Sequence, residues 1–265
     1  MKIRKATSHL HFLIHSFILF IGYIRYSFHL PYRQTEGVIK ATGKSLPSHP
    51  SYGQICKRIN KRLNVDVSSS IDDDDYIILA VDSTGIKVTN RGQWMADKWG
   101  LGKKKGYLKI HVAVNIKTKE ILALDVTDEK THDGKIMKKL VENVLKITPN
   151  KKKIKSILGD GAYDSNDNFR FLNDKKIDPI IKVKRNSAVI LSENNKTRNK
   201  EVRQQTKDFL KWKKKKRYGH RWMAETAFSS IKRMFGEYIM ATSFQNMVKE
   251  MILKVSLYNI FRRTL

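Results

Sequence analysis

Three acidic residues lie in sequence surroundings that are unusual for an acid. Asp82 interrupts the apolar stretch ILAVDSTG, Asp160 ends a second one, SILGDGAYDS, and Glu225 lies in one of the most basic parts of the chain. An unpaired buried carboxylate is costly, so each of these acids needs a partner such as a base or a metal ion. For Asp82 the simpler alternative is that it caps a turn that begins with Ser83 and Thr84.

The two aspartates are expected to lie near each other. Asp82 lies inside a predicted strand and Asp160 at the end of another, and Gly159 and Gly161 on either side of Asp160 allow close approach of the backbone. The ends of neighbouring strands in an α/β sheet meet at one edge, where ligands bind. The pattern therefore predicts Asp82 and Asp160 at one edge of a sheet.

Glu225 belongs to the segment RYGHRWMAETAFSSIKRMFGEY, in which a helix is predicted over about 220–238. At about 100° per residue, four polar residues fall within about 60° on one face: Tyr218, Arg221, Glu225 and Lys232. The predicted core-facing stripe lies opposite and consists of Met223, Ala227, Ile231 and Met234. Simple surface pairing of Arg221 with Glu225, worth about a few tenths of a kcal/mol, is the alternative to a shared functional role.

The charge of the chain indicates a polyanionic partner. Its 265 residues include 53 Lys or Arg against 25 Asp or Glu, a net charge of +28, and 40% hydrophobic residues, which is normal for a packed core. Nucleic acid is the leading candidate. A ribosomal-type basic protein, or a chain from a Lys-biased genome, is the alternative.

A basic insertion is predicted at about 182–217. Residues 182–221 hold 15 Lys or Arg and 3 acidic residues, and the densest part is KWKKKKR. Because this run adjoins Glu225, we expect it to contact DNA phosphates rather than only water. The residues concerned are Lys213, Lys214, Lys215, Lys216 and Arg217, with Trp212 as a candidate for stacking on an extruded base.

The element order predicts a mixed α/β fold. Strands and helices are expected in the order β-β-β-α-β-α-β, followed by two helices. The predicted strands are 76–88, two within 106–129, one ending at 159–161 and 178–184; the predicted helices are 134–146, 165–173, 220–238 and 247–263. We therefore predict one domain over 71–265.

Residues 1–70 are predicted to form a separate helical region that binds DNA. The apolar stretch FLIHSFILFIGYI, residues 12–24, has 13 residues. A membrane span needs roughly 20, so a buried helix is expected and no membrane partner. Two short helices follow in LPYRQTEGVIKATGK and SLPSHPSYGQICKRINKRL, a pair that suits a helix-turn-helix motif, although many helical hairpins touch no DNA. The one cysteine, Cys56, excludes an internal disulfide framework and fits a cytoplasmic protein.

Several further polar and aromatic residues receive structural interpretations. The four aspartates at the end of 67–75 are read as a solvated linker rather than a metal site. Asp133 is predicted to cap the helix that follows it, and Asp164 to cap the next one. Trp94 and Trp99 are expected to pack under the first pair of strands.

The motifs together resemble a known family. The four polar residues of the predicted helix have the spacing Y-x2-R-x3-E-x6-K, which matches the Y-R-E-K signature of the DDE transposases of bacterial and archaeal insertion sequences. VDST at Asp82 and GDGAYDS at Asp160 resemble the first and second acidic motifs of that family. The three motifs occur in the family's order and span residues 76–235, and LPYRQTEG resembles the helical region that precedes the catalytic domain.

The resemblance implies an RNase H-like fold, a mixed sheet flanked by helices, in which Asp82, Asp160 and Glu225 bind two Mg²⁺ or Mn²⁺ ions. Carboxylates are hard ligands suited to these ions, and two metals can assist an in-line phosphoryl displacement. Water would free a 3′-hydroxyl at the end of the element, and that hydroxyl would attack target DNA. Tyr218 and Lys232 would lie near the scissile strand with Arg221. The partner would be double-stranded DNA, and a homodimer would hold two of its terminal inverted repeats.

Two other functions stay open at this point. Another metal nuclease of the same fold, such as a resolvase or RNase, would explain the three acids but not the spacing of the Y-R-E-K signature. A domesticated, non-catalytic DNA-binding protein would explain the charge, but the intact set of acids argues against it.

Overall fold

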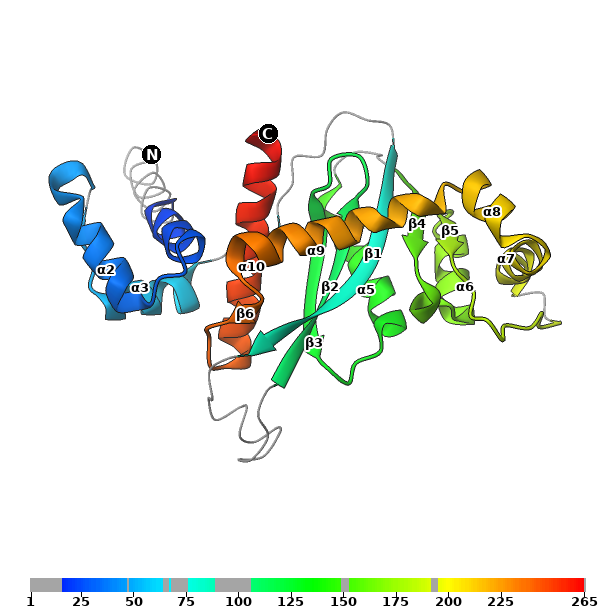
Figure 1. The fold of residues 1–265 in the computed structure, drawn as a ribbon, viewed down its shortest axis with the longest axis horizontal. Coiled ribbons are helices and arrows are strands. Elements are labelled where there is room, and N and C mark those ends of the chain that lie inside the picture. Colours follow the sequence, from blue (N-terminus) through cyan, green and yellow to red (C-terminus); the bar gives the residue numbers. More distant parts are fainter. Residues whose placement is uncertain are drawn as a thin grey trace, which may run out of the picture.

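A mixed six-stranded sheet forms the centre of the computed structural model, which describes residues 16–46, 48–63, 67, 76–88, 106–148, 153–191 and 195–264 (Figure 1). The strand order is β3-β2-β1-β4-β5, and the short β6 pairs with the far end of β1. β2 is antiparallel to β1 and to β3, whereas β4 and β5 run parallel to β1. The strands are β1 (Tyr76–Val88), β2 (Gly106–Asn115), β3 (Ile121–Asp128), β4 (Lys153–Gly159), β5 (Asp178–Ile181) and β6 (Tyr238–Ile239).

Helices cover both faces of this sheet, as the predicted RNase H-like α/β fold requires. α5 (Asp133–Ile147) and α6 (Asn166–Asp174) pack on one face with Leu79 and Val81 of β1. α9 (Trp222–Phe235) and α10 (Phe244–Thr264) pack on the other, and Figure 1 shows α9 crossing in front of the strands. Because both faces of β1 are covered, its first half is apolar throughout instead of alternating. The predicted order β-β-β-α-β-α-β is confirmed from β1 to β5.

The buried stripe of α9 differs from the one predicted. It consists of Ala224, Ala227, Phe228, Ile231 and Phe235, while Met223 and Met234 are only half-buried. These five positions follow the i, i+3, i+4 spacing of an α-helix that begins at Trp222. The physical reason is size: the two phenylalanine rings bury more apolar area against the sheet than the flexible methionines do.

The N-terminal helices pack against the C-terminal helix. Residues 16–27 are helical, which confirms the predicted buried helix as far as it lies within the described ranges. Ile18 and Ile21 share a core cluster with Leu253 of α10, and the hydroxyls of Tyr23 and Ser256 are 2.9 Å apart. Of the helices described here, none is long and apolar enough to cross a membrane.

Two short helices follow in this region, as predicted. They are α2 (Tyr32–Ala41) and α3 (Tyr52–Lys57), and α3 continues as a π-helical turn to Arg62. Ser51 and Gln54 form a capping box that starts α3. A role of these helices in DNA binding stays a prediction. The domain boundary at 70–71, the aspartates 72–75, Trp94 and Trp99 lie outside the described residues.

The basic insertion contains two helices that the sequence analysis did not predict. They are α7 (Lys196–Lys207) and α8 (Phe209–Lys215), and they pack beside β5 and α6 (Figure 1). Gln205 of α7 links them to the sheet: its amide donates to the Ile181 carbonyl at 2.8 Å and accepts from the Val183 amide at 3.0 Å. The insertion is therefore a packed part of the fold.

Two predicted helix caps are wrong. Ser165, not Asp164, caps α6, since its hydroxyl accepts from the Asn168 amide at 3.2 Å. At α5 the capping position is His132, and Asp133 is the first helical residue. Asp133 instead pairs with the Lys109 ammonium at 2.9 Å. In both cases the carboxylate pairs with a cation distant in sequence, Arg198 for Asp164 and Lys109 for Asp133, instead of with the local backbone.

Asp164 is the buried anchor of the insertion. Arg198 of α7 donates to both of its carboxylate oxygens, at 2.7 and 3.1 Å, and the Ser187 hydroxyl and Lys184 amide donate at 2.6 and 2.9 Å. Burial raises the pKa of Asp164, but these hydrogen bonds lower it, and the net pKa lies below its ordinary value of 3.8. The ionised form therefore contributes to stability.

We expect Asp164→Asn to lower the free energy of unfolding at neutral pH by about 3–5 kcal/mol, because Arg198 would be left as a buried charge without its partner. Because folding lowers the pKa of Asp164, its ionised form stabilises the wild-type protein at pH values above 3.8. This stabilisation is lost as the pH falls through the pKa of Asp164 in the folded protein. The difference between the two proteins should accordingly shrink in acid. Urea denaturation over a pH series measures it.

Asp174→Asn, at the exposed end of α6, is the matched control and should change stability by less than about 0.5 kcal/mol. Equal effects of the two substitutions, or an effect of Asp164→Asn that grows as pH falls, would contradict the assignment of Asp164 as the anchor.

Candidate active site

The three acidic residues come from three different elements. Asp82 lies in the middle of β1, Asp160 directly follows β4, and Glu225 is in the first turn of α9. Asp82 thus lies inside its strand, as the predicted strand 76–88 requires. However, the pairing of β1 with β4 ends at Ala80, so Asp82 stands just beyond the edge where β4 stops. The predicted neighbourhood of the two aspartates is formed in this way.

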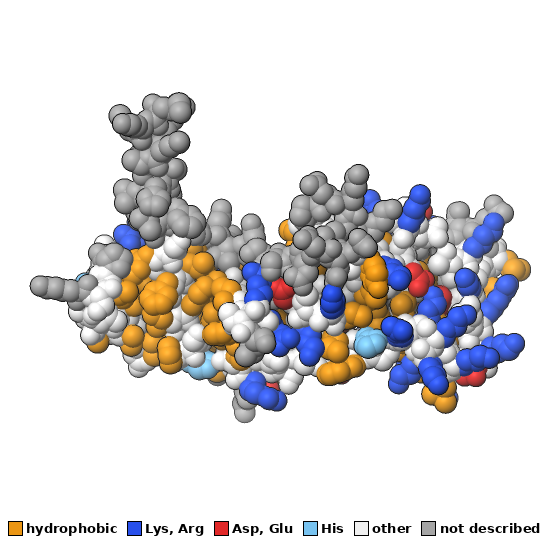
Figure 2. Space-filling model, turned by 90° about the horizontal axis from the view of Figure 1, so that it is seen from above, with side chains coloured by type: hydrophobic (Ala, Val, Ile, Leu, Met, Phe, Trp, Pro, Cys, Tyr) orange, Lys and Arg blue, Asp and Glu red, His pale blue; other side chains and the backbone are white. Residues whose placement is uncertain are grey.

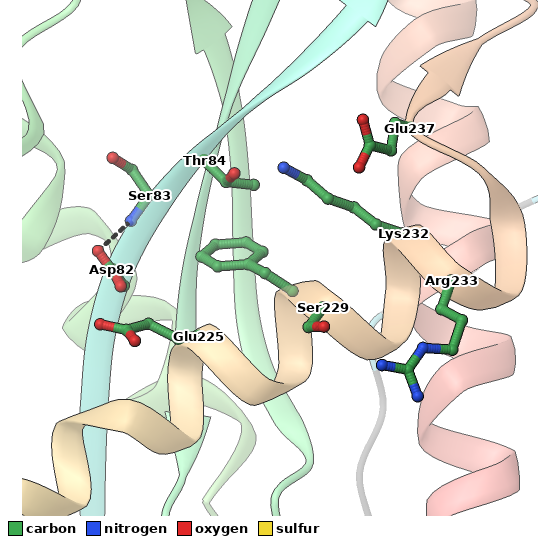
Figure 3. A pocket seen from close by; sticks show the side chains of 9 residues that line it. Asp82, Ser83, Thr84, Glu225, Ser229, Lys232, Arg233 and Glu237 are labelled. Atoms are coloured by element: carbon green, nitrogen blue, oxygen red, sulfur yellow. Dashed lines mark hydrogen bonds between the residues drawn. The ribbon is translucent and has the colours of Figure 1, made fainter.

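Arg221 joins two of these acids. Its guanidinium donates to Oδ2 of Asp82 at 3.0 Å and also to Oε1 of Glu225. The other oxygen of Asp82 accepts from the Ser83 amide at 2.9 Å. Figure 3 shows the carboxylates of Asp82 and Glu225 side by side, one from the strand and one from the helix. The predicted pairing of Arg221 with Glu225 is present, and it extends across to the sheet.

The acids interact through their charges. Burial raises the pKa of Asp82, the nearby carboxylates of Asp160 and Glu225 raise it further, and the Ser83 amide and Arg221 oppose them; the net shift is upward. Burial lowers the pKa of Arg221, but Asp82, Tyr218 and Glu225 together outweigh this effect, and the net shift is upward. Asp160 and Glu225 thus add negative charge around Asp82, while Arg221 bonds only to Asp82 and Glu225, a balance that favours binding of a further cation.

The donor set fits a hard divalent cation, although the acids are not gathered into a ready cage. All three supply carboxylate oxygens, which Mg²⁺ and Mn²⁺ prefer. Glu225 is half-exposed, with 54% of its side chain accessible, and can still move. Among the described residues, no three His, Cys, Asp or Glu side chains lie close enough together to hold a metal ion. Arg221 donates to both Asp82 and Glu225 and so keeps these two carboxylates close to each other.

A cavity of about 470 Å³ opens on one side of the acids (Figure 3). Ser83 and Thr84 line it from β1, and Lys232 lines it from α9. In Figure 3 the ammonium of Lys232 points toward Thr84, two turns along α9 from Glu225. The predicted placement of Lys232 on the same side of the helix as Glu225 is therefore present in the structure.

Tyr218 is placed differently from the prediction. The chain turns at Arg217, which has a φ of 51°, and forms a 3₁₀ turn over Tyr218–Arg221 before α9 starts. The Tyr218 ring is only 8% exposed and packs against Trp212, with ring centroids 5.1 Å apart. Burial raises the pKa of Tyr218 to about 12. The four polar residues of the signature thus do not share one continuous helix.

Trp212 is not available for stacking on DNA, which corrects the prediction. It is 3% exposed, and its indole N–H donates to the carboxylate of Glu201 at 2.6 Å. Lys216 is also engaged, since its ammonium lies 2.9 Å from Asp178 and 3.3 Å from Glu201. Both side chains face inward because α8 must pack on β5, which a solvated basic run would not require.

The other basic residues of the predicted run are exposed: Lys213, Lys214, Lys215 and Arg217. Figure 2 shows Lys and Arg side chains gathered on the end of the molecule where α7 and α8 lie. Three further basic residues belong to the same surroundings and were missed from sequence: Lys182, Lys184 and Arg185 line a cavity together with Asp160 and Arg221. In the sequence these three basic residues form the run IKVKR, which begins at the last residue of β5 and could have indicated them.

Two comparisons with family models agree with this geometry. A model described as a transposase DDE domain matches residues 73–260, which is more than half of the chain. A second model of the same description matches residues 3–91. Because the longer match runs from before β1 into α10, and so includes the whole sheet and all three acids, this chain belongs to the DDE transposase family.

Proposed function

We propose that the protein is an insertion-sequence transposase that cleaves DNA at the ends of its element and joins the freed ends to target DNA. The observation that carries this proposal is the convergence of Asp82, Asp160 and Glu225 on one charge-coupled site at Arg221. Membership of the DDE transposase family supports transposase activity and dependence on a divalent metal. Assembly on two terminal inverted repeats as a homodimer is part of the same proposal.

The reaction consists of two displacements at phosphorus. In the first, water attacks the phosphodiester at the element's end, the bond to the 3′ oxygen breaks, and a 3′-hydroxyl and a 5′-phosphate are left. In the second, that hydroxyl attacks a phosphodiester of the target, and a target 3′-hydroxyl leaves. Bound Mg²⁺ or Mn²⁺, held by Asp82, Asp160 and Glu225, would supply activation of the attacking oxygen and stabilisation of the leaving one.

The basic residues of the site would act on the phosphate. Arg221 has a planar guanidinium that can turn from the carboxylates to phosphate oxygens, and Lys232 offers a second positive charge across the adjoining cavity. Tyr218 is buried beside Arg221, so we assign it the positioning of that guanidinium rather than the direct contact with the scissile strand that the resemblance implied.

Purified protein with Mg²⁺ should nick a duplex that carries the flanking inverted repeat at the repeat boundary. We expect Asp82→Ala, Asp160→Ala and Glu225→Ala each to reduce nicking to background. The loss of a metal ligand should exceed the roughly 10- to 100-fold loss typical of residues that only support a ligand. Gel analysis of end-labelled DNA measures the cleavage.

Glu142→Ala, which removes an exposed acid from α5, is the control and should leave nicking unchanged. Cleavage that persists in all three substituted proteins would refute the assignment of these acids to the active site. DNA binding without any cleavage by the wild-type protein would favour a non-catalytic DNA-binding function instead.

Arg221 and the metal are expected to compete for the same carboxylates. In EDTA, Arg221→Ala should lower the free energy of unfolding by about 1.5–3 kcal/mol, since hydrogen bonds to two charged groups are lost. Excess Mg²⁺ should then stabilise this variant more than the wild type, because no guanidinium has to be displaced. Urea denaturation of both proteins, with EDTA and with Mg²⁺, measures the two effects.

The matched control is Arg170→Ala, which removes a guanidinium from an exposed position of α6, away from the acids. Its stability and its response to Mg²⁺ should equal those of the wild type. The proposal of a shared metal site fails if Mg²⁺ stabilises the wild type and Arg221→Ala by the same amount, or stabilises neither.

A further inference from the structure

The carboxylate of Asp160 is held by the short turn that follows it. The chain forms a 3₁₀ turn over Gly161–Tyr163, and Oδ1 of Asp160 accepts from the Ala162 amide at 2.9 Å. The backbone carbonyl of Asp160 accepts from the Tyr163 amide at 3.2 Å. The position of Ala162 therefore sets the direction in which the carboxylate of Asp160 points.

Ala162 also rests on the first turn of α5. A Cβ on Gly134 would lie 2.8 Å from the carbonyl oxygen of Ala162, closer than real Cβ atoms approach, so the two backbones fit only because position 134 has no side chain. The buried Asn168 of α6 ties the two segments together. Its side-chain amide donates to the Gly134 carbonyl at 2.9 Å and to the Tyr163 carbonyl at 3.0 Å. We call Gly134 and Asn168 the turn clamp.

The start of α5 is fixed to the sheet. The carboxylate of Asp133, the residue before Gly134, lies 2.9 Å from the Lys109 ammonium of β2. Lys109 also donates to the Thr131 carbonyl just before the helix, at 3.1 Å. Because these contacts hold α5 in place, a displacement at the turn clamp is borne by the turn that carries Asp160.

The far end of the turn is fixed as well. The ring of Tyr163 is fully buried and lies against Gly159, where a Cβ would come within 3.1 Å of its Cδ2 atom. Asp164 then pairs with Arg198 of α7. The segment in between, Ala162 with the carboxylate that it holds, is therefore the part that responds to a change at the turn clamp.

We propose that Gly134 and Asn168 are positioning residues for Asp160, and that the turn clamp keeps its carboxylate where it binds a divalent metal ion together with Asp82. Both residues act through the turn at Ala162. The clamp lies on the α5 face of the sheet and α9 on the other, so it supports Asp160 independently of the contacts of the α9 acid. The inference rests on the proposed function, since it gives a cause for the position of one proposed metal ligand.

The test is the Kd of the full chain for Mn²⁺ without DNA, measured from the electron paramagnetic resonance signal of the free ion. Mn²⁺ takes the same oxygen ligands as Mg²⁺. We expect Asn168→Ala to raise this Kd about 10- to 100-fold, the loss typical of residues that support a metal ligand. Nicking by Asn168→Ala should recover toward the wild-type rate as Mn²⁺ is raised, whereas Asp160→Ala should stay inactive.

Gly134→Ala tests the same contact without removing a hydrogen bond. The added methyl group pushes against the Ala162 carbonyl and should raise the Kd for Mn²⁺ about tenfold. The higher helix propensity of alanine offsets part of the cost of the clash, so this variant keeps the test decisive even if Asn168→Ala folds poorly.

Two matched controls carry the same substitutions away from the acids. Asn259→Ala removes a fully buried side chain of α10 that bonds to the amide and the carbonyl of Ile121, at 2.9 and 2.8 Å. It should lower stability as Asn168→Ala does and leave the Kd for Mn²⁺ unchanged. Gly37→Ala adds a methyl group to α2 where, in the described structure, no other part of the fold lies within 4 Å. It should also leave this Kd unchanged.

The inference is overturned if Asn168→Ala and Gly134→Ala, shown to be folded by circular dichroism, bind Mn²⁺ like the wild type. It is also overturned if Asn259→Ala weakens Mn²⁺ binding equally, because the effect would then follow from stability alone.

Asp160→Ala separates this inference from the proposed function. If Asp160→Ala weakens Mn²⁺ binding and the two clamp variants do not, the proposed metal site stands and the turn clamp is refuted. If Asp160→Ala itself binds Mn²⁺ like the wild type, the proposed metal site is refuted and the inference with it.

Discussion

The bridge from Arg221 to Asp82 and Glu225 is the interaction on which the arrangement of the site depends. Three carboxylates in one neighbourhood repel each other, and burial makes the charge on Asp82 more costly still. One guanidinium between strand and helix offsets part of that cost. For this to occur, α9 must cross β1 at Asp82, and the 3₁₀ turn before α9 must deliver Arg221 to the same point.

The insertion and the sheet support this arrangement from the side. The hydrogen bonds of Asp164, Arg198 and Gln205 join α7 to β5 and the segments beside it. Trp212 and Tyr218 pack against Leu158 and Ile180 of the sheet and thereby position the turn that leads into α9. Polar and aromatic residues that look available for DNA in the sequence are thus used to hold the surfaces that remain exposed.

The charge of the chain is divided between the two sides of the site. Acids and few cations surround the cavity at Lys232, whereas cations dominate the cavity lined by Lys182, Lys184 and Arg185. A net charge of +28 by itself would attract DNA without orienting it. In the proposed function this unequal distribution would orient the DNA, with the acids on one side of the site and the basic surface on the other.

The sequence by itself determined the element order, the α/β fold and the family, because hydrophobic periodicity and motif spacing are local properties of the chain. It also identified Asp82, Asp160 and Glu225, since an acid inside an apolar run or a basic helix is visible without coordinates. Only the tertiary structure decided which polar side chains remain free. Trp212 and Lys216 turned inward and Asp164 became an anchor, because Glu201 and Arg198, distant in sequence, compete for them with solvent and with the local backbone.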